Sequence, residues 1–402
     1  MKGSKVKSFL SPFSFNKVPD LKKTSGTPET SETPGTSPGL WNLRNLIFVP
    51  LQPRLIITLL LLCGKLHAQV LGGNSVFNFL KLPNTPQLSA LGGVNVSSPS
   101  NDIGLAVNNP ALLRPAMHSQ MNAAFNNFYD GIKAYGLSLG YNHQPLNTTF
   151  LWALNYLDYG TIPQTDAAGN MLGTFRPVDW SMQVSASRKY LEKWRYGMTL
   201  KFIHSGYGQY KSSGIAADVG VLYSDSLHSF SASVVAKNMG TQLKRYEGTG
   251  PDDLPFDLQA GLSKRFENSP FGFSVTLHHL HQFDLAYNDT LFNNANGFSN
   301  GSRGFSADKI FRHIVLAGNI YLGDKVQVDL GYNYLRRKEL AIGSSGNGLT
   351  GFSMGVSLLL NKLQVRYARS QYQNSTAYNQ FGLNIPLNQY FGLGKWGEKI
   401  GW

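Results

Sequence analysis

The sequence is poor in cysteine, in charged residues and in long hydrophobic runs. Cys63 is the one cysteine in 402 residues, which excludes a disulfide framework and a site of clustered thiolates. Charged residues make up 15% of the chain, against roughly 25% in a typical soluble protein. No apolar run reaches the roughly 20 residues of a membrane-spanning helix. These absences exclude a helical membrane protein and argue against a soluble enzyme.

Glycine and aromatic residues are abundant instead. The chain holds 42 glycines, 24 phenylalanines and 19 tyrosines. A membrane β-barrel needs an apolar outer band, aromatic girdles and small residues at bends. Composition therefore favours such a barrel, while a glycine-rich soluble β-protein stays open at this point.

A short apolar segment lies well inside the chain. Leu55–Leu62 follows Arg54 and precedes a stretch that ends at Ala68. A basic residue, a short apolar core and a small residue before a polar one are typical of a secretory signal. We expect cleavage after Ala68 and not lipidation of Cys63, because Leu62 stands where a small residue is needed. The mature chain then has no cysteine.

The chain divides into five expected segments. Residues 1–50 are rich in Ser, Thr, Pro and Lys and are interpreted as a disordered extension or the product of a start codon assigned too far upstream. The remaining segments are a signal peptide at 51–68, a plug or periplasmic segment at 69–119, a transmembrane barrel at 120–390 and a tail at 391–402.

From residue 120 onward, apolar and polar residues alternate. In Trp180–Ser187 one face carries Trp, Met, Val and Ala, and the other carries Ser and Gln. Period two is typical of strands with two different faces. The predicted strands are 120–128, 133–142, 149–157, 180–188, 194–204, 216–223, 229–237, 257–266, 271–281, 313–322, 326–334, 352–360, 362–370 and 378–386.

The predicted connections alternate in length. Those after even-numbered strands are short. Most of those after odd-numbered strands are long, at 158–179, 205–215, 238–256, 282–312 and 335–351. Short turns on one rim and long loops on the other are typical of outer-membrane barrels. We therefore predict an all-β protein, a transmembrane antiparallel β-barrel of about 14 strands, in a bacterial outer membrane.

Basic residues are spread along the chain. The formal charge is +13, of which +6 lies in residues 1–68 (nine basic minus three acidic), so no nucleic-acid footprint is indicated. Small basic groups occur in two of the long connections. They are candidates for contacts with lipopolysaccharide phosphates or a partner, against the alternative of solvated charge. These candidates are Lys244, Arg245, Arg336, Arg337 and Lys338.

Three motifs resemble catalytic, cofactor-binding or metal-binding patterns, and none predicts catalysis or a cofactor. Two of them are sequence patterns rich in glycine. Gly351–Gly355 matches the hydrolase pattern G-x-S-x-G, but no Asp or His follows Ser353 to complete a triad. Gly392–Gly397 matches a dinucleotide fingerprint but leaves no room for the helix that the fingerprint needs. Both are interpreted as chance, with Ser353 facing the lumen.

His278, His279 and His281 form the one histidine cluster of the sequence. On a regular strand His279 and His281 share a face and His278 points away. Asp284 already lies in the following loop, so no carboxylate completes a site at period two. We therefore predict rim histidines and no metal site.

The segment before the barrel carries the most distinctive motifs. Its S-V-F-N-F-L-x-L-P opening, its A-L-G-G element and its N-N-P-A-L-L element resemble the PorQ family, outer-membrane components of the type IX secretion system. The last two elements are shared more widely with PorV and with fatty-acid-transporter-like barrels. The motif residues are Phe77, Asn78, Leu82, Pro83, Gly92, Gly93, Asn109, Pro110 and Ala111.

The resemblance implies a role without catalysis. Members of this family are understood to anchor a PorZ-like surface protein in an attachment complex with PorV and the PorU sortase, where cargo is joined to lipopolysaccharide. The long loops are then the expected partner contacts. The alternative is a fatty-acid-transporter-like barrel for hydrophobic small molecules, which predicts an apolar pocket near the plug and a lateral opening beside a kinked strand.

Overall fold

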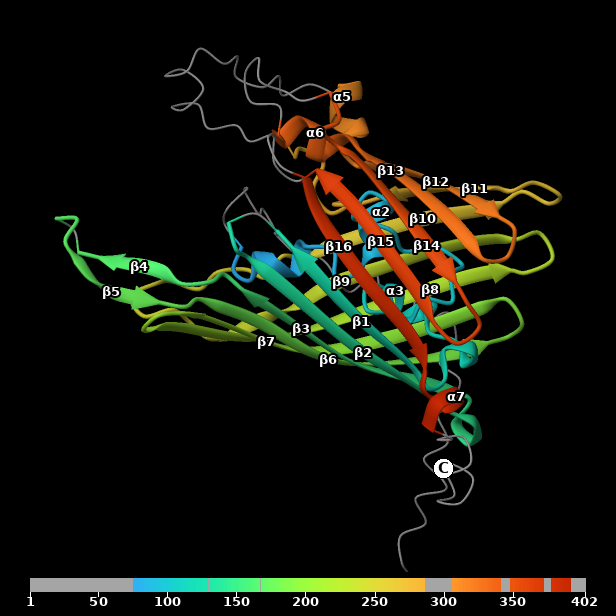
Figure 1. Ribbon diagram of the computed structural model, residues 1–402, viewed down its shortest axis with the longest axis horizontal. Helices are drawn as coiled ribbons and strands as arrows, with labels where there is room; N and C mark the ends of the chain where they lie inside the picture. Colours follow the sequence, from blue (N-terminus) through green and yellow to red (C-terminus); the bar gives the residue numbers. More distant parts are fainter. Residues whose placement is uncertain are drawn as a thin grey trace, which may run out of the picture. The chain divides into compact units, whose positions relative to one another are not determined.

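The computed structural model describes residues 75–128, 130–166, 168–285, 306–340, 348–371 and 377–391. Within these ranges the chain forms a closed antiparallel barrel of 14 strands (Figure 1), which confirms the predicted fold. The expected disordered extension, signal peptide and tail beyond Phe391 lie outside the described residues.

Within the described ranges, no helix combines the length and the apolar character needed to cross a membrane.

The strands follow one another around the barrel in chain order, with one interruption. Strand β3 pairs directly with β6, because β4 and β5 form a separate two-stranded hairpin, and β1 closes the barrel by pairing with β16. The barrel strands are β1 (Gln120–Asn127), β2 (Lys133–His143), β3 (Thr148–Asp158), β6 (Val178–Tyr190), β7 (Trp194–Tyr207), β8 (Tyr210–Asp225), β9 (Phe230–Lys244), β10 (Asp257–Arg265), β11 (Phe271–Leu277), β12 (Ile314–Leu322), β13 (Val326–Asn333), β14 (Phe352–Leu359), β15 (Gln364–Gln371) and β16 (Ala377–Pro386).

The two faces of the barrel differ as the alternation predicts. On β6 the side chains of Ser181, Gln183 and Ser185 are buried inside, whereas Met182 and Val184 are exposed on the outer face. The same pattern recurs around the barrel, with exposed leucines, valines, phenylalanines and methionines outside. An apolar exterior on a closed sheet is the arrangement that a lipid bilayer requires, because all backbone groups are paired within the sheet.

The connections on one rim are short and most of those on the other rim are longer, with two departures from the prediction. All turns after even-numbered barrel strands are short, as expected. The predicted loop 205–215 is wrong: β7 and β8 continue through it and meet at a two-residue turn with Tyr207 opposite Tyr210. The predicted loop 158–179 contains the hairpin of β4 (Ile162–Thr165) and β5 (Met171–Phe175). We call the rim with the longer connections the loop-bearing rim.

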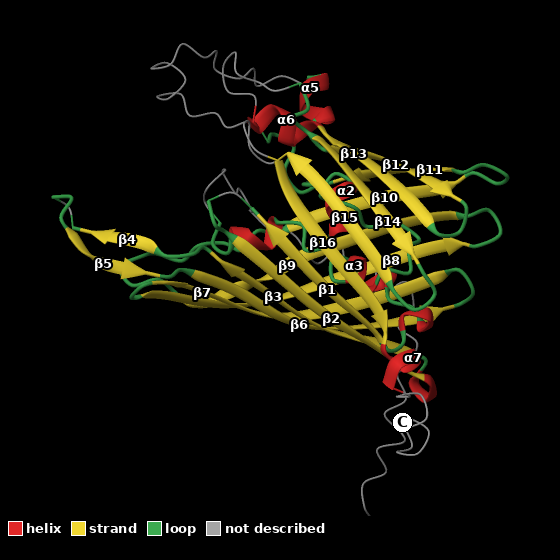
Figure 2. Ribbon diagram, in the orientation of Figure 1, coloured by secondary structure: helices red, strands yellow, loops and turns green. Residues whose placement is uncertain are grey.

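Helices are short and lie before the barrel or on its rims (Figure 2). The first five belong to residues 75–119, which we call the plug because they lie in the lumen. The helices are η2 (Asn78–Lys81), α2 (Pro86–Ala90), α3 (Ile103–Ala106), η3 (Pro110–Leu112), η4 (Pro115–Met117), η5 (Gln144–Leu146), α5 (Ala307–Phe311), α6 (Tyr334–Leu340) and α7 (Leu387–Phe391).

The plug forms an apolar core of its own inside a polar lumen. Thr85 caps α2 by accepting a hydrogen bond from the Leu88 amide at 3.3 Å, with Pro86 at the first helical position. The side chains that these short helices bury contact one another and two inward residues of β3, Leu151 and Ala153. This cluster also contains Leu88, Ile103, Leu105, Ala106, Val107, Ala111, Leu112, Leu113, Met117 and Leu222.

Candidate functional site: the plug, its pocket and the loop-bearing rim

Polar side chains attach the plug to strands all around the barrel. The Asn95 side chain donates to Ser274 Oγ on β11 at 2.9 Å. The hydroxyls of Ser97 and Ser263 on β10 lie 2.7 Å apart. On the other side of the lumen, Ser89 hydrogen bonds to Gln380 on β16. Each bond also satisfies a buried polar group of the wall, so the inward serines and amides form a surface complementary to the plug.

The A-L-G-G motif makes the closest approach of plug to wall. Gly92 and Gly93 have φ values of +89° and +84°, a region that residues with a side chain rarely occupy. They end α2 and bring its backbone against β13, where a Cβ on Gly331 would overlap the Gly92 amide and lie 2.5 Å from the Ala90 oxygen. Glycine is therefore required on both sides of this contact.

Ser353 belongs to the same contact. Its hydroxyl accepts the Gly92 amide at 3.1 Å and donates to the Ala90 carbonyl at 3.0 Å. The predicted lumen-facing orientation is confirmed. The serine of the G-x-S-x-G pattern therefore holds the plug in place, while the other chance motif, residues 392–397, lies outside the described residues.

The N-N-P-A-L-L motif forms a second contact, with β7 to β9. The Asn109 side chain donates to the Val96 carbonyl and to Ser233 Oγ, both at 2.7 Å, and accepts the Ala111 amide at 3.0 Å. Pro110 packs against Gly197, where a Cβ would lie 2.7 Å from the Ala111 nitrogen. This asparagine thus caps η3 and anchors it to the wall at once.

The opening motif packs against the barrel near the loop-bearing rim. Phe77 is buried in a cluster with Val76, Ile203, Ala216 and Leu254. Asn78 donates to the Ser75 carbonyl and accepts its hydroxyl, both at 2.7 Å. Leu82 and Pro83 line a pocket described below. Seven of the nine motif residues therefore form packing or hydrogen-bond contacts that position the plug, and the other two, Leu82 and Pro83, border the pocket.

Buried charges lie between plug and wall. Asp102 in the plug is 3.3 Å from Arg366 Nε on β15, and both side chains are buried. On the opposite wall, Lys201 Nζ lies 2.6 Å from Asp218 Oδ2. Lys237 is buried beside them and donates to Asn108 of the plug. These pairs satisfy charges that would otherwise be costly inside the barrel.

A β-bulge shapes this cationic corner. Register shifts between β8 and β9 at residues 217–219, and Asn238 adopts a left-handed conformation with φ of +57°. Its amide therefore donates to Asp218 Oδ1 at 2.7 Å, while its side-chain oxygen accepts Lys201 at 2.9 Å. Asn238, the irregular residue of the strand, thus holds the side chains of both Asp218 and Lys201 in place.

A pocket remains between the plug and β1 to β3. Its volume is about 80 Å³, and it extends from Phe79 and Phe128 inward to Lys201 and Lys237. The lining combines aromatic and aliphatic side chains with amides and two buried ammonium groups. The fatty-acid-transporter alternative predicted an apolar pocket near the plug, and a pocket does lie there, with polar groups among its apolar lining. Among the described strands every neighbouring pair is hydrogen-bonded, so no lateral gap opens beside it.

The five basic candidates for surface contacts do not form one surface. Lys244 ends β9 and Arg245 follows it, both exposed. Arg336 is buried in α6, which corrects its prediction as a surface contact: the predicted loop begins with a helix that turns this side chain inward. Arg337 is exposed. Lys338 lies 3.3 Å from Asp308 of α5.

The hairpin β4–β5 was missed by the sequence prediction. It extends beyond the ends of its neighbours on the loop-bearing rim (Figure 1). Met171 and Leu172 expose 66% and 63% of their surfaces, and Ile162 is also exposed. Asp166 closes the turn by accepting amides of the following residues. Pro163, this aspartate and Gly169 were signals that could have revealed a hairpin.

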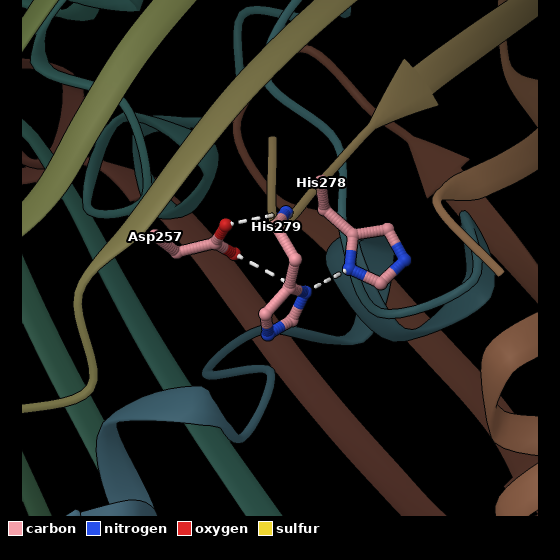
Figure 3. A group of neighbouring side chains, drawn as sticks. All are labelled: Asp257, His278 and His279. Carbon is pink, nitrogen blue, oxygen red and sulfur yellow. Dashed lines mark hydrogen bonds and ion pairs between the residues drawn. The ribbon is translucent and has the colours of Figure 1, made fainter. Parts of the chain in front are cut away.

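Histidines of the cluster lie at the same rim, in an arrangement that the sequence did not predict (Figure 3). The Nδ1 atoms of His278 and His279 face each other at 2.5 Å. The prediction that His278 points away is wrong, because β11 ends at Leu277 and His279 is left-handed, with φ of +54°. Asp257 on the adjacent strand β10 brings a carboxylate that period-two reasoning along one strand could not find.

Burial favours the neutral forms of these histidines. Burial and the neighbouring His279 lower the pKa of His278 to about 3. Burial also lowers the pKa of His279 and of His281. A neutral imidazole keeps the lone pair with which it can accept a proton or bind a metal.

Comparisons with known proteins show a likeness of fold but identify no family. No family model matches the chain, and no curated protein matches it. Among solved structures, the Pseudomonas putida toluene transporter TodX has 9% identity over 76% of this chain and 97% of its own, with a TM-score of 0.44. A Pseudomonas aeruginosa FadL homologue has 9% identity over 75% and 97%, with a TM-score of 0.39. The KdgM porin has 5% identity over 66% and 98%, with a TM-score of 0.30.

Proposed function

We propose that this chain is an outer-membrane barrel that docks a protein partner at the cell surface, with the β4–β5 hairpin as the principal contact. The carrying observation is the exposure of Met171 and Leu172 on a hairpin beyond the barrel rim. An isolated two-stranded hairpin is marginally stable in water. Exposed apolar residues on such an element mark an interaction site, since burial by a partner would stabilise both.

The plug supports an anchoring role. It is hydrogen-bonded to strands from β6 to β16, and the space that it leaves beside β1 to β3 is about 80 Å³. An engineered apolar cavity that binds benzene has a volume of about 150 Å³. A lumen occupied by a hydrogen-bonded plug is compatible with a barrel that acts through its exposed rim.

The partner proposed is the one that the family resemblance implies. The motifs resemble the PorQ family, so we assign the rim to a PorZ-like surface protein within an attachment complex with PorV-like and PorU-like components. Exposed Lys244 and Arg245 on the same rim would add contacts to an acidic partner or to lipopolysaccharide phosphates.

The test is a pull-down from native membranes in mild detergent. We expect the wild-type chain to recover a large secreted β-rich protein together with a sortase. Met171→Lys/Leu172→Lys places two charges on the proposed contact and should reduce recovery at least tenfold. Leu227→Lys is the matched control, because Leu227 is 81% exposed on the opposite rim. Equal recovery by the double variant, or recovery of the barrel alone by wild type, would contradict docking.

A second candidate function is transport of hydrophobic small molecules. The pocket lined by Phe79, Leu82 and Phe128 favours it, and TodX is titled a toluene transporter. The titles of the TodX and FadL-homologue structures are closer to this candidate than to docking. Buried Lys201 and Lys237 also line this pocket, so a hydrophobic molecule that crossed the barrel by this route would have to pass two ammonium groups. Bound fatty acid or hydrocarbon in the purified barrel would support it.

A further inference from the structure

We propose that Asp257, His278 and His279 bind a divalent transition metal ion of the zinc type at the loop-bearing rim. Two imidazoles and one carboxylate are a ligand set that Zn²⁺ uses in proteins, with a remaining position for water. Asp257 starts β10, the two histidines directly follow the neighbouring strand β11, and the three side chains lie close together (Figure 3). The site is independent of the docking role.

The three side chains lie close enough together to share one ion after a local adjustment. The two Nδ1 atoms are 2.5 Å apart, and Asp257 Oδ2 lies 4.0 Å from His279 Nδ1. All three ligand atoms lie within 4.8 Å of one another. Metal–ligand bonds of 2.0–2.1 Å in a tetrahedral site place ligand atoms about 3.3 Å apart. Binding an ion therefore requires the imidazoles to spread apart and the carboxylate to move closer.

The backbone holds the two histidines in place. The His278 amide donates to the His313 carbonyl at 3.0 Å, and the His278 carbonyl accepts the His313 ring nitrogen at 2.8 Å. The left-handed conformation of His279 turns its side chain toward its predecessor. A non-glycine residue in this conformation is strained and is found where function or packing needs that orientation.

A second layer of polar groups supports the carboxylate. The Gln259 side chain donates to Asp257 Oδ2 at 2.6 Å, and the His279 amide donates to Oδ1 at 2.6 Å. Orienting bonds of this kind are a regular feature of metal ligands. The buried Oε1 of Gln259 has no hydrogen-bond partner among the described residues. A water bound to the ion would satisfy it.

There is room for the ion and its water. A cavity of about 80 Å³ borders Asp257, Gln259 and His279 on the plug side, and a water needs about 10–15 Å³. Lys81 of the plug also lies near enough for its charge to act on Asp257 and His279. Its ammonium opposes any cation at this site, and the two imidazole ligands favour transition metals such as Zn²⁺ over Ca²⁺.

The bound ion would link two long connections. Asp257 starts β10, directly after connection 245–256, and the histidines start connection 278–313. A metal bridging them would cross-link the start of β10 to the residues that directly follow β11.

The test is metal binding by the purified full chain in detergent, without a histidine tag and after removal of metal by chelator. We expect about one equivalent of Zn²⁺ to remain after desalting, and Co²⁺ to give the visible absorption of a tetrahedral site. His279→Gln and Asp257→Asn should each weaken binding at least tenfold. His228→Gln is the matched control, since His228 also faces a carboxylate, Asp225 at 3.1 Å, outside the cluster.

Folding is monitored separately by the heat-dependent electrophoretic mobility of the barrel. If a variant fails to fold, the wild-type measurement still decides: no retained Zn²⁺ and no Co²⁺ spectrum overturns the proposal. Equal binding by folded His279→Gln and Asp257→Asn overturns it as well.

Discussion

At the scale of single residues, the plug depends on positions where no side chain fits. Gly331 of β13 touches the backbone of Ala90 to Gly92. Backbone cannot retreat as a flexible side chain can, so an added methyl must displace the whole turn after α2. Because Ser353 bonds to the same turn at 3.0 and 3.1 Å, that displacement also breaks two buried hydrogen bonds.

Gly331→Ala should therefore destabilise the barrel by about 1–3 kcal/mol, the usual range for overpacking. Urea unfolding in detergent measures this change. Gly250→Ala is the control, because nothing lies within 4 Å of a Cβ at Gly250, and we expect no loss there. Equal stability of Gly331→Ala and wild type would mean that the plug is not seated against β13 as described.

At the scale of elements, two helices of the loop-bearing rim are joined by one carboxylate. Asp308 of α5 accepts the Tyr334 hydroxyl at 2.7 Å and Arg312 at 2.8 Å, and Lys338 of α6 lies 3.3 Å away. Burial opposes ionisation of Asp308, yet the hydrogen bonds from Tyr334 and Arg312 hold its pKa at about 2.

Asp308→Asn should loosen α5 from α6. We expect tryptic cleavage after Arg312 to accelerate roughly fivefold at pH 8, as for the loss of an ion pair of about 1 kcal/mol. Asp324→Asn, in an exposed short turn on the other rim, should leave the rate unchanged. The folded-state pKa is lowered, so the stabilisation is complete above the unfolded value of about 3.9 and disappears as pH falls through about 2. Cleavage equal to that of wild type would contradict the clamp.

The strands could be predicted from sequence because burial alternates along them. Ser181 and Gln183 face the plug while Met182 and Val184 face outward, and period two records that directly. The pattern fails where the backbone departs from the strand. The left-handed His279 reverses the expected direction of a neighbour, and α6 buries Arg336 in what looked like a loop.

Contacts between strands were beyond the reach of the sequence. Asp257 reaches the histidines across a register that no pattern within β10 or β11 specifies. The plug motifs could be recognised, but what they contact could not: Asn109 meets Ser233, more than a hundred residues later. Contacts between residues that are far apart in the sequence can be identified only from the folded barrel.

At the scale of the whole barrel, docking and transport differ in what the plug must do. Docking uses the rim and leaves the plug still. Transport needs a path past the plug, and we expect the plug to move for it, because the cavities of about 80 to 210 Å³ that border the plug are each lined in part by charged side chains. Fixing the plug to the wall should therefore leave docking intact and stop transport.

Ser97→Cys/Ser263→Cys offers such a lock, since the two serine hydroxyls lie 2.7 Å apart between plug and β10. The double variant also carries Cys63→Ser, so that no other thiol can take part in disulfide formation. A disulfide should form on oxidation, and partner recovery in the pull-down should equal that of the reduced protein. Toluene or fatty-acid uptake by reconstituted vesicles is measured in parallel, with Ser97→Cys alone as the control. Loss of recovery on oxidation would contradict docking by a static barrel. Uptake that is present when reduced and abolished when oxidised would instead assign the barrel to transport.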